Sequence, residues 1–201
     1  MADYTQAQSE LLAHQELTHP GHIVGADVNV ATMLSGVVHI WQGKIETTAD
    51  LTAGLDFIEI QASPDASGNL WQTIGKYVPS GTAATDTAFD AGEDIGQTVL
   101  SVATTAGKTT GELIYIVDAT GIAQSEWAEV ATVVTDDTVT VVDGLVVTKT
   151  TDDHIYTQAS RWAQYVDLSG YLRLRVVVQH YGATGSDWRV YAVLEAATDF
   201  E

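Results

Sequence analysis

The stretch "QSEWAEVATVVTDDTVTVVDG", residues 124–144, decides the fold class of this chain. Apolar and polar residues alternate on both sides of Thr135-Asp136-Asp137, a pattern that predicts two antiparallel strands joined by a turn. The alternation places Val130, Thr132 and Val134 on one face of the first strand, Val133 on the other, and Val139 and Val141 in the second strand. The stretch contains no nucleophile–base pair, metal cage or phosphate loop, so it predicts a packing element.

Short strands continue on either side of this hairpin. "QTVLSVATT" (97–105), "GELIYIVD" (111–118) and "HIYTQA" (154–159) are separated by Gly and Asp residues. Strands spaced by about 8 to 12 residues with turn signals between them are typical of a small barrel or sandwich. Residues 85–157 are therefore predicted to form a small β module.

Longer strands flank the module. "LDFIEIQAS" (55–63) alternates cleanly. In "YLRLRVVVQ" (171–179), one face is aliphatic and the other carries Arg173 and Arg175. We expect an all-β fold: an antiparallel, jelly-roll-like β-sandwich of residues 28–80 plus 158–201, into which the module is inserted. Two consecutive domains are the alternative. The small, acidic segment 79–94 is expected to be a linker or boundary.

Residues 1–27 differ from the rest of the chain. The segment around Leu11 and Leu12 favours two helical turns, which "THPGH" (18–22) would end. We expect an extended N-terminal arm that becomes ordered only against a partner or against the body of the protein.

Composition limits the class of protein. Of 201 residues, 45% are apolar, and no apolar run reaches the roughly 20 residues needed to span a bilayer. The first fifteen residues lack the basic and apolar regions of a secretory signal, so synthesis in the cytoplasm without export is expected. The absence of cysteine excludes disulfides, thiolate metal sites and cysteine nucleophiles.

The charge balance argues against anionic partners. Eight basic and 27 acidic side chains give a formal net charge of −19. Proteins that hold nucleic acid neutralise phosphates with Lys and Arg, and this chain has few of either. Neither nucleic acid nor an anionic membrane is therefore expected as a partner.

Two groups of side chains are candidates for metal binding. His14, His19 and His22 lie close in sequence, but Pro20-Gly21 within the group leaves its geometry unfixed, and solvated arm residues are the alternative. The acidic loop offers oxygen ligands that match no EF-hand spacing: Asp86, Asp90, Glu93 and Asp94. We predict no metal and no cofactor.

The sequence also lacks the motifs of common catalytic sites. The sequence contains no Gly-x-Ser-x-Gly elbow, no GxGxxG and no P-loop, and no carboxylate pair stands out for glycoside hydrolysis. We therefore predict no enzymatic activity and no catalytic residues.

The five tryptophans fall in or beside predicted strands: Trp41, Trp71, Trp127, Trp162 and Trp188. Strand aromatics commonly pack across neighbouring strands. A place in the core or at a subunit interface is favoured, and the alternative is a set of exposed platforms that stack on sugars.

A family resemblance is carried by "GQTVLSVATTAG" (96–107), "GELIYIVD" (111–118) and "QSEWAEVATVVTDDTVTVVDGL" (124–145). These segments resemble a small β module of structural proteins in tailed bacteriophages. The flanking segments 31–78 and 161–182 resemble phage virion proteins of the capsid decoration, or cement, type. The resemblance covers about residues 28–199 and leaves out the N-terminal arm.

This resemblance implies a non-enzymatic protein assembled in the host cytoplasm and located on the outer surface of the virion capsid. Its partners would be the major capsid protein and further copies of itself, as a homotrimer. A tail, neck or head-fibre module that binds host-surface glycans is the alternative. The predicted partner-binding residues are Leu11, Leu12, Ile23 and Trp127.

Overall fold

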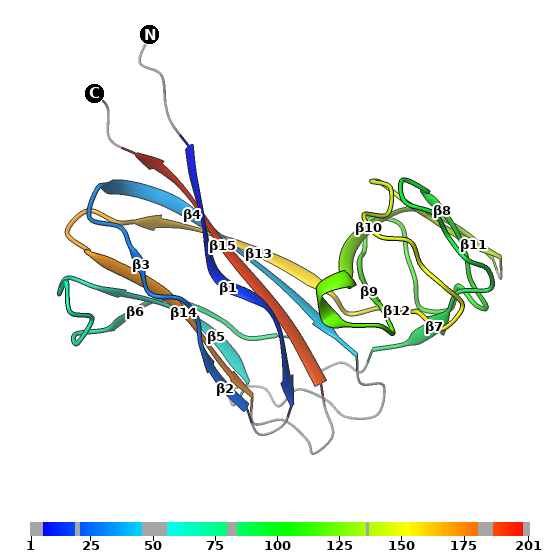
Figure 1. Cartoon of the computed structure of the whole chain (residues 1–201), viewed down its shortest axis with the longest axis horizontal. Coiled ribbons are helices and arrows are strands. Elements are labelled where there is room, and N and C mark those ends of the chain that lie inside the picture. Colours follow the sequence, from blue (N-terminus) through cyan, green and yellow to red (C-terminus); the bar gives the residue numbers. More distant parts are fainter. Residues whose placement is uncertain are drawn as a thin grey trace, which may run out of the picture.

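The computed structural model describes residues 6–18, 21–45, 56–79, 84–135, 137–180 and 187–198. The described residues form fifteen strands and one three-residue 3-10 helix, η1 (Ile122–Gln124). The all-β fold class is confirmed, and every strand pair is antiparallel. Figure 1 shows two bodies side by side, a sandwich and a smaller curled sheet. The described part of the chain has no helix long and apolar enough to cross a membrane.

The sandwich consists of two sheets. The first has the order β1 (Gln6–Thr18), β15 (Asp187–Thr198), β4 (Met33–Lys44) and β13 (Ser160–Asp167). The second has the order β2 (Gly21–Val24), β14 (Arg173–His180), β5 (Phe57–Ser63) and β6 (Gln72–Tyr77), and β3 (Val28–Asn29) also pairs with β14. The two sheets bury their inner faces against each other, as the β-sandwich prediction requires.

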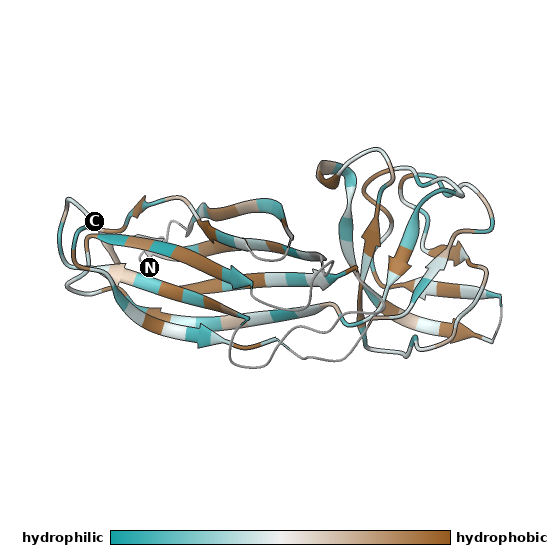
Figure 2. Cartoon of the chain, turned by 90° about the horizontal axis from the view of Figure 1, so that it is seen from below, coloured by the Kyte–Doolittle hydropathy of each residue, from teal (hydrophilic) through white to brown (hydrophobic). Residues whose placement is uncertain are grey.

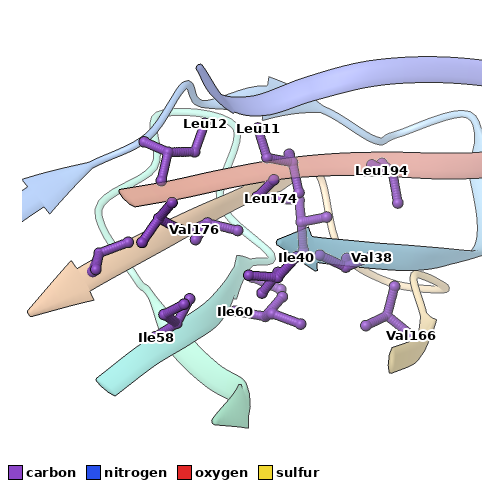
Figure 3. Packing of buried hydrophobic residues seen from close by; sticks show 14 of the residues in the cluster. Leu11, Leu12, Val38, Ile40, Ile58, Ile60, Val166, Leu174, Val176 and Leu194 are labelled. Atoms are coloured by element: carbon purple, nitrogen blue, oxygen red, sulfur yellow. The ribbon is translucent and has the colours of Figure 1, made fainter. Parts of the chain in front are cut away.

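The sandwich core follows the alternation of the sequence. Ile58 and Ile60 on β5 are buried, as are the aliphatic side chains of β14. Figure 3 shows these side chains filling the space between the sheets. On the opposite face of β14, the Arg175 guanidinium lies 3.9 Å from the ring centre of Trp71 and donates two hydrogen bonds to Gln61 Oε1. The predicted faces of this strand are therefore confirmed.

The third sheet is curled into a small barrel. Its order is β7 (Asp86–Ala88), β12 (His154–Tyr156), β9 (Leu113–Val117), β10 (Glu126–Val134), β11 (Thr138–Val141) and β8 (Val99–Ser101). A bridge between Phe89 and Val102 joins the two edges, supported by a backbone bond from Ala103 N to Ala88 O. Brown and teal residues alternate along many of its strands in Figure 2, and the apolar ones form a separate core.

All six strands of the barrel come from residues 86–156, and the strands of the sandwich come from 6–77 and 160–198. The exact domain boundaries stay predictions. Within the segment expected to be a linker, however, β7 is a barrel strand and Phe89 belongs to the barrel core. The linker prediction is wrong there, because the small residues of this acidic segment pair with β12.

The hairpin of residues 126–141 forms as predicted, but its faces differ from the prediction. Val133 pairs with Val139, and a bulge interrupts the register between Val130 and Thr132. The extra residue reverses the alternation, so Val133 packs on the barrel core while Thr132 and Val134 are exposed. The prediction that Val130, Thr132 and Val134 share one face is therefore wrong. Asp136 of the turn lies outside the described residues.

The N-terminal segment is an extended strand and not a pair of helical turns. β1 pairs with β15 over most of its length, with register shifts between Glu10 and Gln15. These shifts allow the adjacent Leu11 and Leu12 both to enter the core, where Figure 3 shows them above Leu174 and Val176. The segment is ordered against the body of the protein because it completes the edge of the first sheet.

Candidate binding site at the junction of sandwich and barrel

Five aromatic or imidazole rings meet where the barrel joins the sandwich. His14 from β1, Trp41 from β4, Tyr115 from β9, Trp127 from β10 and Tyr191 from β15 form this junction cluster. The ring centres of His14 and Trp127 are 4.6 Å apart, those of Tyr115 and Trp127 4.8 Å, and those of Trp41 and Tyr191 5.6 Å. At these separations aromatic rings are in favourable contact.

Strand register places these rings. Trp127 lies opposite Tyr115 in the barrel, and Trp41 lies opposite Tyr191 in the sandwich. Directly opposed aromatic residues on neighbouring strands stabilise a sheet pair. The contact between Trp127 and Tyr191, with ring centres 6.5 Å apart, joins the barrel pair to the sandwich pair.

A glycine makes this approach feasible. A Cβ atom at Gly43, near the end of β4, would lie 2.6 Å from Cγ of Tyr115. No real Cβ contact is that short, so a larger residue would push the barrel away from the sandwich. Gly43 is therefore required by the docking of Tyr115.

A hydrogen bond crosses the same junction. The Tyr115 hydroxyl lies 2.7 Å from Nε2 of His14. Burial, assisted by the charge of Arg189, lowers the pKa of His14 to about 4. Burial also raises the pKa of Tyr115 far above its ordinary value, against a smaller opposing effect of Ser125. At neutral pH both groups are uncharged, and the phenol donates to the imidazole.

Two pockets flank the Trp127 side chain. One, of about 280 Å³, is lined by His14, Trp41, Ser125, Glu126, Trp127 and Tyr191. The other, of about 290 Å³, also lies against Trp41 and Trp127. Its charged lining residues are Glu126, Glu129, Asp143 and Arg161. The indole Nε1 of Trp127 is buried and has no hydrogen-bond partner within the described part of the chain. Flat rings beside a few polar groups suit the binding of a ligand with one apolar face.

The sequence-predicted contact residues are distributed over different parts of the molecule. Trp127 lies at the junction, and Ile23 is half-buried on β2, where it packs against the sandwich core. Their roles stay predictions. Leu11 and Leu12 are buried inside the chain's own core. Their assignment as partner-binding residues is therefore corrected, since neither is accessible to a partner in the folded chain.

The sequence did not indicate four of the five junction residues as a group. The sequence pattern predicts His14 only as one of three candidate metal ligands and Trp41 only as one of five tryptophans in or beside strands. No periodicity relates residues 14, 41, 115 and 191, because their proximity depends on how the barrel docks. The only local signal is the placing of aromatic residues within strands.

The described histidines of the candidate metal group have separate surroundings. His14 is hydrogen-bonded to Tyr115, His22 is exposed on β2, and His19 lies outside the described residues. Among the residues that the structure describes, no group of three His, Asp or Glu side chains is placed to hold a metal ion.

The acidic loop is likewise dispersed. Asp86 lies 3.1 Å from Nδ1 of His154, and the buried Glu93 accepts a hydrogen bond from the backbone of Ser101. Asp90 and Asp94 are exposed. Asp86 and Glu93 therefore have separate partners within the barrel.

Comparison with known proteins gave only weak similarities. No protein-family model matches the chain, and no curated protein matches it. Among solved structures, it is similar to VP17, a capsid protein of bacteriophage P23-77, with 10% identity over 98% of this chain and 97% of that one, at a TM-score of 0.22.

A structure of infectious bursal disease virus, Gx strain, has 11% identity and a TM-score of 0.23. That similarity covers all of this chain but 42% of the viral one, so the chain spans less than half of that neighbour's length. Both weak neighbours come from viruses, and TM-scores this low do not establish a shared fold.

Proposed function

We propose that this chain is a non-enzymatic structural protein of a virion and that it decorates or cements the outside of a phage capsid. The observation that carries the proposal is the combination of two β bodies held together by a packed junction with large apolar side chains left exposed on both. Such a molecule offers contact surfaces at two separated places.

The sandwich surface is centred on an edge strand. Tyr165 on β13 is 68% exposed and lies beside a groove of about 360 Å³. The groove is lined by Ile74, Gln164, Tyr165, Val166, Asp167, Ser169 and Tyr171. Buried aromatic anchors provide much of the binding energy of protein interfaces, and Tyr165 is such an anchor for a capsid subunit or a second copy of the chain.

The barrel surface is aliphatic. Ile95 and Val146 are 66% and 73% exposed, and Val142, four residues before Val146, is also exposed. The two segments that carry these residues are joined by backbone bonds between Gly96 and Leu145 and between Leu145 and Gln97. Exposed apolar residues grouped in this way mark interaction sites.

Charge and chemistry support an outer location. A net charge of −19 repels packaged DNA, and a cysteine-free chain needs no oxidising compartment to fold. Together with the resemblance to phage decoration proteins, these properties suit an outer-surface protein whose partners are the major capsid protein and its own copies in a homotrimer.

Two measurements test the proposal: the number of copies of the chain per particle, and the binding of surface variants to capsids. Purified particles analysed by quantitative mass spectrometry are expected to contain hundreds of copies of the chain; a handful would contradict decoration. Tyr165→Ser and Val146→Ser should each lower occupancy on capsids that lack the protein. Leu70→Ser, at a similarly exposed leucine in the β5–β6 turn, is the matched control. Unchanged occupancy of both surface variants would refute the proposed contacts.

The second candidate is a tail, neck or head-fibre module that binds host-surface glycans. The pocket beside Trp127 favours it, because it is lined by Trp41, Trp127 and Tyr191 and indole faces stack on sugars. Binding on a glycan array that is lost in Trp41→Ala would support this function and displace the first.

A further inference from the structure

The barrel buries a lysine between two carboxylates. The Lys149 side chain is fully buried, and those of Asp118 and Glu126 are 4% and 13% exposed. The Lys149 Nζ lies 3.4 Å from Asp118 Oδ2 and 3.3 Å from Glu126 Oε1, and it donates to the carbonyl of Gln124 at 2.5 Å. An ammonium and a carboxylate held together out of water form an ion pair. The same two groups can also condense to an amide with loss of water.

Strand pairing fixes the three groups. Asp118 directly follows β9 and Glu126 begins β10, and these two strands are neighbours in the barrel. The backbone of Lys149 exchanges two hydrogen bonds with Glu93, of 2.9 and 2.8 Å. Reacting groups held in this way gain the rate advantage of an intramolecular reaction.

The Asp118 carboxyl group is oriented for attack by the amine. Its Oδ1 accepts hydrogen bonds from the backbone N–H, at 2.8 Å, and from the hydroxyl of Thr120, so Oδ2 is left facing Lys149. Two donors at Oδ1 stabilise negative charge that develops there when a nucleophile adds to Cγ.

The Asp118 carboxyl group is ionised at neutral pH, and this determines how many protons amide formation must supply to it. Burial acts to raise the pKa of Asp118, but the bonds from Thr120 and the charge of Lys149 outweigh it and hold the pKa below its ordinary value. The leaving oxygen must therefore receive its protons during the reaction.

Glu126 is placed to move those protons. Its Oε2 accepts a hydrogen bond of 2.9 Å from the backbone of Val146, which fixes the side chain. Its Oε1 is buried, and among the described residues its polar neighbour is the Lys149 ammonium. A carboxylate in contact with the amine is suited to accept its protons and to release them again during the reaction.

We propose that Lys149 and Asp118 form an intramolecular isopeptide bond, with Glu126 as the catalytic proton carrier. Nζ bonds to Cγ of Asp118, and the bond from Cγ to Oδ2 breaks. Two protons leave Nζ, pass through Glu126 and end on Oδ2, which departs as water. Oδ1 becomes the amide oxygen, Glu126 is regenerated, and no oxidant or reductant is consumed.

The bond would close a covalent loop from residue 118 to residue 149. This loop contains η1, β10 and β11 and therefore carries Trp127 of the junction cluster. In a chain without cysteine it supplies the type of cross-link that a disulfide supplies elsewhere.

The test is the mass of the wild-type chain. Under denaturing conditions, the intact protein is expected to be lighter than its sequence by one water. Trypsin cleaves after Lys108, Lys149 and Arg161 in this region. An isopeptide at Lys149 blocks the middle site, so digestion should yield fragment 109–161 lacking one water. Full mass together with release of fragment 109–149 would overturn the proposal.

Variants assign the roles. Lys149→Arg keeps the positive charge and Glu126→Gln keeps the shape, and both should have the full mass. A Glu126→Gln protein that still loses water would overturn the role of Glu126. Succinimide formation at Asp143-Gly144 also removes water, but it leaves Lys149 cleavable; water loss with release of 109–149 therefore counts against the isopeptide.

Discussion

The buried His14 should make the stability of this protein depend on pH. Its pKa is about 4 in the folded chain and 6.5 ordinarily, so the unfolded chain binds the proton more tightly. The contribution of His14 is fully present above pH 6.5 and is lost as pH falls from 6.5 towards 4, because protonation then favours the unfolded chain.

The magnitude follows from the two pKa values. The full shift corresponds to about 3 kcal/mol in the free energy of unfolding. At pH 5 the unfolded imidazole is almost wholly protonated and the folded one is mostly neutral, so about 2 kcal/mol of this is lost relative to pH 7. The loss reflects the cost of placing a charged ring between Tyr115, Trp127 and Arg189.

Urea denaturation of the wild type and of His14→Gln at pH 7 and pH 5 measures this effect. Glutamine accepts the Tyr115 hydrogen bond but does not titrate, so all other groups cancel in the comparison. The wild type should lose about 2 kcal/mol more than the variant between the two pH values. An equal loss in both proteins would refute the reasoning, and so would a histidine that titrates near 6.5 in the folded state.

Three further substitutions test the packing. Leu12→Ala should lower the free energy of unfolding by about 2–5 kcal/mol, measured by urea denaturation, because Leu12 is buried in the sandwich core. Gly43→Ala should cost about 1–3 kcal/mol and change the tryptophan fluorescence, because its Cβ would collide with Tyr115. Val133→Lys should lower the melting temperature, because Val133 packs on the barrel core, whereas Val134→Lys should change stability by less than about 0.5 kcal/mol.

Substitutions of the same type at exposed or open positions serve as controls for these variants. Leu34 is half exposed in β4, and Leu34→Ala should be nearly neutral. A Cβ at Gly121 meets no atom within 4 Å, so Gly121→Ala should leave the fluorescence unchanged. Equal effects of Leu12→Ala and Leu34→Ala would place β1 outside the core. Equal effects at residues 133 and 134 would contradict the bulge in β10.

The local alternation of apolar and polar residues was sufficient to predict the strands that have one apolar and one polar face. β5 and β14 both bury the aliphatic face predicted for them, although Val177 on the opposite face of β14 is buried as well. The hairpin of β10 and β11 was predictable for the same reason, but its faces were not. A bulge adds one residue to one strand, and nothing in "VATVV" (130–134) marks where the extra residue lies.

The N-terminal strand was not predictable from its own residues. "QAQSELLAHQELT" (6–18) is rich in residues that favour helices or have weak strand preference. It becomes a strand because it pairs with the edge strand β15. Its side chains Leu11 and Leu12 also fill space in the sandwich core that would otherwise be empty. The junction cluster depends on similar long-range information, since its five residues span positions 14 to 191.

The position of β1 also determines which variants can test partner contacts. The barrel touches the sandwich through β1, β4, β13 and β15, the strands of the first sheet, and β1 supplies His14 to this contact. Removing the N-terminal segment would therefore expose the sandwich core and weaken the junction together. A loss of capsid binding after such a deletion would report unfolding and not the loss of a contact arm. Tyr165 and Val146 are largely exposed, so point substitutions there are expected to leave the sandwich core and the junction intact and to separate recognition from folding.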